Sequence, residues 1–178
     1  MRTVLTLLAA LAVCAAPAGA LTLKPVSFSE LVSGSVAIVY ARVRAVEGHW
    51  TADRRRIESI VTADAVEYYK GSLGADVRFV LPGGEAGGMR MVLPGAPVLA
   101  PGDLVVLCLG ADGPAMPRPV GLTQGIFRVA VDRRTGGLLV TPPPVVTAGR
   151  VVRGAPGRQP IPLAAFAASV REELEAAR

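Results

Sequence analysis

The fold is decided by the stretch from Val36 to Val46, which reads VAIVYARVRAV. In its second half apolar and charged residues alternate. Arg42 and Arg44 fall on one face of an extended chain, and the other face carries Val39, Ala41, Val43 and Ala45. A period of two is typical of a half-buried β-strand. The stretch therefore predicts a sheet that buries one of its faces.

Further apolar runs follow, separated by turns rich in Gly and Pro. The strands predicted from them cover residues 57–69, 76–81, 89–93, 104–109, 125–131 and 138–141. In the first of these the apolar phase shifts between Val61 and Val66, which indicates a bulge. Many short strands of this kind favour a barrel or sandwich over a parallel α/β sheet. We expect a mainly β fold, a small OB-like Greek-key barrel of five to seven short strands within residues 21–141.

Helical patterns flank this region. Ser27 and Glu30 have the spacing of a capping box, which predicts a short helical turn before the first strand. Residues 142–162 are rich in Pro and Gly and predict a linker or an extended arm. After this arm, an apolar residue recurs every fourth position, at Phe166, Val170 and Leu174. This spacing predicts a C-terminal helix over 163–178 with one face packed on the barrel.

The first 20 residues have the layout of a secretory signal peptide. One positive charge at Arg2 precedes an uncharged apolar run and the small residues Ala18-Gly19-Ala20. A retained anchor is the alternative, and a lipid-modified Cys14 is disfavoured because Val13 precedes it. We expect cleavage after Ala20, no membrane span in the remaining chain, and export to the periplasm or the medium.

Removal of that segment would leave Cys108 as the single cysteine. It lies in an apolar run, residues 104–109, that predicts a buried strand, whereas a reactive thiol needs exposure and a positive neighbour. The chain has 19 Lys and Arg against 14 Asp and Glu, a modest excess. Its richness in Arg, Ala, Gly, Pro and Val is typical of the coding bias of a GC-rich bacterial genome.

Residues for catalysis or metal binding are scarce. His49 is the single histidine, and a zinc site takes three or four ligands. No serine lies in a Gly-x-Ser-x-Gly elbow, and the glycine-rich residues 83–88 lack the Lys-Ser/Thr pair of a phosphate loop. We therefore expect no enzyme activity, no catalytic residue, no metal and no cofactor.

The charge run Arg54-Arg55-Arg56 predicts a solvated hairpin tip rather than a nucleic-acid site. Single-stranded nucleic acids are bound where basic residues alternate with exposed aromatic residues, and aromatic residues make up 4% of this chain. We expect no nucleic-acid partner.

Loops at one rim of the barrel are the candidate binding site, because loops on a rigid scaffold carry most binding sites. The predicted binding residues are His49, Trp50, Arg54, Arg55, Arg56, Gly83, Gly84, Glu85, Gly87 and Gly88. They indicate a non-enzymatic module that binds a protein or peptide partner outside the cytoplasm. The alternatives are a structural component of the cell envelope, suggested by the Pro-rich arm, and an unrecognised hydrolase or redox protein using Cys108 or His49. The oligomeric state stays open.

The order of these motifs resembles a family of uncharacterised exported bacterial proteins. The resemblance rests on Ser29-Glu30-Leu31, Ala37 to Val43, the Trp50 loop, Val66 to Gly71, Val77 to Val80 before Gly83-Gly84, Pro101-Gly102-Asp103 and Val120 to Val129. The strand ending in Lys70-Gly71 is also similar to the netrin-like domain of tissue inhibitors of metalloproteinases. That similarity implies a five-stranded barrel with a helix, and a secreted protease as partner. Those inhibitors chelate zinc through an N-terminal cysteine, whereas the processed chain would begin at Leu21.

Overall fold

The computed structural model describes residues 25–111, 116–143, 145–147, 150–152 and 159–178, and side chains at 145–147 and 150–152 are not described. The predicted signal segment 1–20, with Cys14, lies outside these residues. An eight-stranded antiparallel sheet dominates the described chain, in the order β12-β9-β8-β6-β1-β2-β3 with β7 beside β6. The prediction of a mainly β fold with a C-terminal helix is confirmed.

The elements have the following bounds. The sheet contains β1 (Ala37–Trp50), β2 (Ile57–Lys70), β3 (Asp76–Pro82), β6 (Leu104–Gly110), β7 (Arg118–Pro119), β8 (Ile126–Val131), β9 (Leu138–Thr141) and β12 (Ile161–Pro162). Two separate hairpins pair β4 (Gly84–Ala86) with β5 (Met89–Met91) and β10 (Val145–Thr147) with β11 (Arg150–Val152). The helices are α2 (Phe28–Gly34), the 3-10 helix η1 (Leu122–Gly125) and α3 (Leu163–Ala176).

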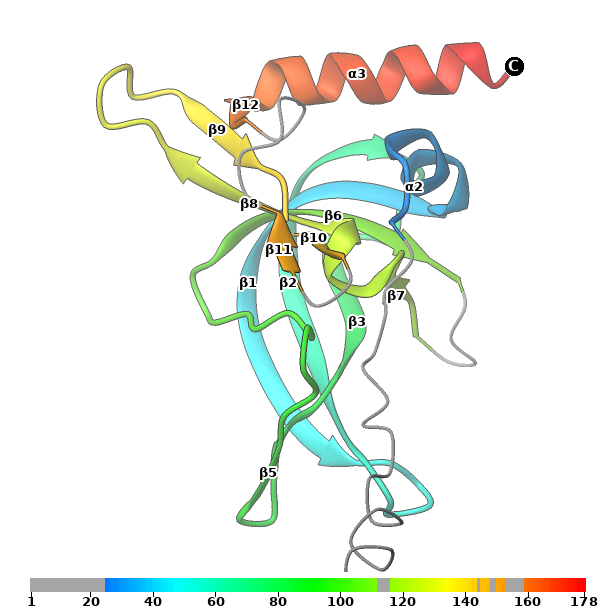
Figure 1. Ribbon diagram of the computed structural model, residues 1–178, viewed down its shortest axis with the longest axis vertical. Coiled ribbons are helices and arrows are strands. Elements are labelled where there is room, and N and C mark those ends of the chain that lie inside the picture. The colour runs from blue at the N-terminus through cyan, green and yellow to red at the C-terminus, as the bar shows by residue number, and fades with distance from the viewer. Residues whose placement is uncertain (1–24, 112–115, 144, 148–149, 153–158) are drawn as a thin grey trace, which may run out of the picture.

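β1 is the central strand, and it is longer than the sequence predicted. Its first half pairs with β2 on one side and with β6 on the other, and residues 37–41 are buried on both faces of the sheet. Its second half continues to Trp50 while pairing with β2, well past the predicted end at Val46. The β1–β2 hairpin therefore extends well beyond the end of β6, while β3 follows it as far as Glu58 (Figure 1).

The sheet is strongly curved, and its inner face holds one apolar core (Figure 1). Alternate residues of β1, β2, β3 and β6 point into this core, as the period of a strand requires. They are joined by one residue from a loop and one from β8. The cluster comprises Val39, Ala41, Val43, Val61, Ala63, Val77, Phe79, Leu81, Leu99, Val105, Leu107, Leu109 and Ile126.

On the outer face of the sheet, α2 and α3 cover residues of β1, β6, β8 and β9. Phe166 of α3 contacts the rings of Phe28 and Phe127 at centroid distances of 5.5 and 5.0 Å. The predicted capping box is present, since the Glu30 backbone N–H donates to Ser27 Oγ and the Ser27 N–H donates to Glu30 Oε2. Both helices lie at one end of the molecule (Figure 1).

Register shifts in the β1–β2 ladder account for part of the curvature. Tyr40 pairs with Glu67 and Ala41 pairs with Ala65, so Val66 is left as an extra residue and its side chain is exposed. This confirms the bulge predicted from the phase shift before Val66. The strand ladders leave the sheet open at β3 and β12, although the Val80 N–H of β3 donates to the Pro117 carbonyl at 3.0 Å.

The Pro/Gly-rich region 142–162 contains strands as well as irregular chain. The β10–β11 hairpin lies within it, and β12 pairs with β9 immediately before α3 begins. The composition of this region predicted none of these strands, because Pro and Gly mark chain breaks but do not exclude short pairings.

Candidate binding groove

The β1–β2 and β4–β5 hairpins lie together at the end of the molecule opposite the helices (Figure 1). The β4–β5 hairpin packs on β1 at Gly48, where a side chain would overlap the backbone of Glu85. The close approach therefore depends on a residue without a Cβ atom. It brings together two loops that are more than 30 residues apart in the sequence.

Backbone and side-chain hydrogen bonds fix the base of the β4–β5 hairpin. The Ser59 hydroxyl donates to the Gly83 carbonyl at 2.8 Å, and the Gly83 N–H donates to the Ile57 carbonyl at 2.9 Å. The Ile57 N–H donates to the Met91 sulfur at 3.4 Å, a weak acceptor. A Cβ at Gly84 would overlap Ser59 Oγ.

The turn of this hairpin is Gly87-Gly88. Both residues have positive φ, 58° and 75°, as the central residues of a type I′ turn require. Trp50 Nε1 lies 3.4 Å from where a Cβ of Gly87 would be, so the side chain at the end of β1 lies against this turn. The glycine-rich residues 83–88, which the sequence places in a rim loop, are not a loop throughout, because Gly84–Ala86 pairs with Met89–Met91 as a strand.

A groove of about 310 Å³ opens between the β4–β5 hairpin, the chain that follows it and the inner face of the sheet. Its floor is formed by side chains of the sheet and of the loop before β6: Val46, Ser59, Leu81 and Leu99. Its walls include Gly83, Gly84, Glu85, Arg90, Val92 and residues 96–98. We call this cavity the mouth groove.

Apolar side chains project from the segment that borders the mouth groove. Met89, Val92 and Val98 are 61%, 70% and 76% exposed, and the last two line the groove. An apolar patch beside a concave surface is typical of an interaction site. Val98 is held in place by its carbonyl, which accepts a hydrogen bond from the Arg128 guanidinium at 2.5 Å.

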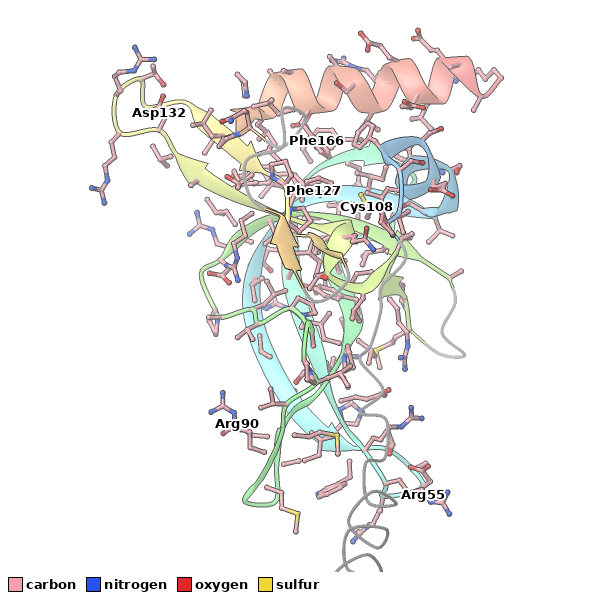
Figure 2. The ribbon with its side chains drawn as sticks, in the orientation of Figure 1. Arg55, Arg90, Cys108, Phe127, Asp132 and Phe166 are labelled. Atoms are coloured by element: carbon pink, nitrogen blue, oxygen red, sulfur yellow. The ribbon has the colours of Figure 1, made fainter. Side chains whose placement is uncertain are left out.

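The three arginines occupy the β1–β2 turn, at the tip rather than at the groove. Within this turn the Asp53 carboxylate accepts hydrogen bonds from the Thr51 hydroxyl and the Arg55 N–H, and these bonds hold its pKa below the ordinary value. Arg54 has a φ of 52°, in the left-handed region. The guanidinium groups of Arg54, Arg55 and Arg56 form no ion pair with any described residue. Figure 2 shows Arg55 and Arg90 at this end of the molecule.

His49 corrects a prediction. It lies in β1 rather than in an exposed loop, and its Nδ1 is buried without a hydrogen-bond partner. It does not line the mouth groove.

The structure thus divides the predicted binding residues into groups. Gly83, Gly84 and Glu85 line the mouth groove. Trp50 lies against Gly87, which forms the β4–β5 turn with Gly88, and the arginines lie in the β1–β2 turn that follows Trp50.

Sequence reasoning missed the groove's apolar side chains. Met89 to Leu93 was predicted as a strand, but the ladder ends at Met91. The signal in the sequence is an apolar run, Met91 to Leu93 and Pro97 to Leu99, interrupted by the Pro94-Gly95 turn. Such a run cannot complete a strand and leaves valines exposed.

Cys108 lies in β6 with its side chain fully buried, which confirms the prediction of a buried strand residue. Burial raises the pKa of its thiol from the ordinary 9.0 to about 12, against a smaller lowering by Ser35. A thiol in this state supplies no nucleophile. Tyr69, on the same outer face, has its pKa raised by burial and then by Glu67.

A second hollow of about 290 Å³ lies under α3. Phe28, Phe127, Val140 and Phe166 are among its lining residues, so it belongs to the packing of the helices on the sheet. No group of three or more His, Cys, Asp or Glu side chains that could hold a metal occurs in the part of the chain that the structure describes. Over the same residues, no helix is both long and apolar enough to cross a membrane.

Comparison with known proteins gives no relative. No family model matches the chain, and neither a curated protein nor a solved structure matches it significantly. The function is therefore argued from the geometry of the site.

Proposed function

We propose that the protein is an exported, non-enzymatic binding module that holds a protein or peptide partner in the mouth groove. The observation that carries this proposal is the groove itself, a concave apolar surface bordered by the exposed side chains of Val92 and Val98. Its volume of about 310 Å³ is at the small end of the range for ligand sites, about 300–1,000 Å³. That volume suits a few side chains of a partner.

The anchoring of the β4–β5 hairpin supports the proposal. Binding to a surface that is already ordered avoids the entropic cost of fixing a loop. The bonds of Gly83 to Ile57 and Ser59 hold the hairpin base before any partner arrives. Trp50 and the arginines add the residue types that most often anchor protein contacts.

The same proposal includes a finer account of the fold. We propose that the curved sheet is an OB-like barrel, related to the netrin-like domain, in which β3 and β7 meet to close the ring. The Val80–Pro117 hydrogen bond and the Arg118–Glu58 ion pair at 2.8 Å support this account. A secreted protease is then one candidate partner, bound through the groove because the chain offers no cysteine at the predicted processed terminus.

The test exchanges one exposed valine for arginine. The protein is first used to capture its partner by crosslinking from envelope and culture-supernatant fractions, and the captured partner is then purified. Val98→Arg places a charge on the groove wall and should weaken binding of that partner about tenfold or more.

Val131→Arg is the matched control, because Val131 is also an exposed valine but lies on β8, away from the groove. It should leave the affinity unchanged. Equal binding by wild type and Val98→Arg would show that the mouth groove is the wrong surface.

A further inference from the structure

We infer that the partner enters the mouth groove as an extended acidic peptide segment that pairs with the outer edge of β5. This inference rests on the proposed function and names the chemistry of the partner. It depends on three features: a free strand edge, an apolar groove beside it and a cluster of arginines at the same end of the molecule.

The register of the β4–β5 hairpin identifies the free edge. Ala86 pairs with Met89 across the two-residue turn, and Glu85 pairs with Arg90. Residues that flank a two-residue turn exchange both backbone hydrogen bonds, and the next pair exchanges none. The N–H and C=O groups of Arg90 therefore point away from β4.

This outer edge is unoccupied within the part of the chain that the structure describes. β4 and β5 form a sheet of two strands, and no backbone hydrogen bond outside that ladder involves Arg90 or Val92. A strand edge of this kind accepts an extended peptide as an additional strand. On the opposite side of the hairpin, Glu85 packs against Gly48, so that side is closed to a peptide.

The groove beside the edge matches the period of an added strand. Arg90 of β5 and Val92, which follows β5 directly, both line the mouth groove. Alternate side chains of a strand point to the same face, so every second residue of a paired peptide would face the groove. The floor of Val46, Leu81 and Leu99 favours apolar residues at those positions.

The charge of nearby side chains of the protein determines which residues are favoured at the other positions of the peptide. Arg54 and Arg55 form no ion pair with a described residue, and the Asp53 carboxylate is already bonded to Thr51 and to the Arg55 N–H. Trp50, which precedes the β1–β2 turn, lies close to Gly87, so these arginines lie at the same end of the molecule as the β4–β5 turn (Figure 2). Their positive charge favours carboxylates in a peptide that binds at this end of the molecule.

The experiment uses synthetic peptides and the full chain, purified as the producing cell processes it. The probe is a fluorescent peptide in which valine alternates with glutamate, and its matched forms carry lysine or glutamine instead. Binding is followed by fluorescence polarisation. The glutamate peptide should bind about tenfold or more tightly than the lysine peptide, and added salt should reduce the difference.

N-methylation tests the backbone pairing. Methyl groups on the amides of one alternate set of residues should weaken the glutamate peptide about tenfold, while methyl groups on the other set should have little effect. Along one edge, a strand forms hydrogen bonds through the amides of alternate residues only. Equal effects of both sets, or no effect of either, would overturn the inference.

Variants test the charge. Arg54→Gln with Arg55→Gln should weaken the glutamate peptide about tenfold, and Arg133→Gln with Arg134→Gln, in the turn before β9, should leave it unchanged. Equal affinities for the three peptides, or no binding of any, would overturn the inference.

The proposed function is judged separately from the inference. If Val98→Arg weakens binding of the captured partner while the peptides show no preference, the groove is a binding site whose partner has different chemistry. If Val98→Arg has no effect either, both proposals fail.

Discussion

Gly48 is the residue on which the position of the β4–β5 hairpin depends. Gly48→Ala would place a methyl group on the backbone of Glu85, which cannot move as a flexible side chain can. We predict a loss of about 1–3 kcal/mol in the free energy of unfolding, measured by urea denaturation, together with weaker partner binding. Gly34→Ala is the control, because its Cβ would meet Val120 at an ordinary 3.6 Å. Equal stability of Gly48→Ala and wild type would contradict the packing described.

Because Cys108 is buried, the free energy of unfolding should fall as the pH becomes alkaline. Its pKa is about 12 in the folded protein and near 9.0 when the thiol is exposed, so unfolding releases a proton above pH 9. The stabilisation is complete below pH 9 and is lost as the pH rises toward 12, with a loss of about 1.4 kcal/mol at pH 10.

The measurement is urea denaturation of wild type and Cys108→Ala between pH 8 and 10. The variant should have the flatter profile. Tyr69 adds little in this pH range, because an exposed tyrosine titrates at higher pH than an exposed thiol. Parallel profiles would show that the thiol ionises equally in both states.

At the scale of elements, the docking of α3 depends on Phe166. Its ring contacts Phe28, Phe127 and Tyr69 and is almost completely buried. Phe166→Ala should lower the free energy of unfolding by about 3–5 kcal/mol, as measured by urea denaturation. Val131→Ala, at an exposed position, should change it by less than about 0.5 kcal/mol. A small effect of Phe166→Ala would mean that α3 does not form part of the cooperative core.

Elements with local causes could be predicted from the sequence. Ser27 and Glu30 cap α2 through bonds within one helical turn. The spacing of Phe166, Val170 and Leu174 predicted α3 because one helix face carries its whole packing signal. The phase shift before Val66 predicted the bulge because this signal also lies within one short stretch of sequence.

Elements that are fixed by contacts between residues far apart in the sequence could not be predicted from it. The glycines of residues 83–88 indicate a loop, and they form a strand because Ile57, Ser59 and Gly48 provide bonds and space for it. His49 follows a glycine and precedes a turn, yet pairing with Glu58 keeps it in β1. The floor of the mouth groove combines Val46, Leu81 and Leu99, which no spacing in the sequence relates.

In the whole molecule, the helices that help to stabilise the fold and the residues proposed to bind a partner lie at opposite ends. Its helices cover the outer face of the sheet at one end, and the two hairpin turns lie at the other (Figure 2). Sites on loops tolerate change better than cores do. Substitutions of the exposed valines on the groove wall, Val92 and Val98, should therefore alter binding while the free energy of unfolding stays within about 0.5 kcal/mol of wild type.

Photo-crosslinking from single positions tests the central claim, that the mouth groove holds the partner, most directly. A photoreactive amino acid replaces Val98 in one version of the protein and Val131 in another, and both are expressed in the producing cell and irradiated. The account predicts a discrete crosslinked protein from position 98 and none from position 131. The same crosslinked proteins from both positions, or crosslinks from position 131 alone, would contradict it.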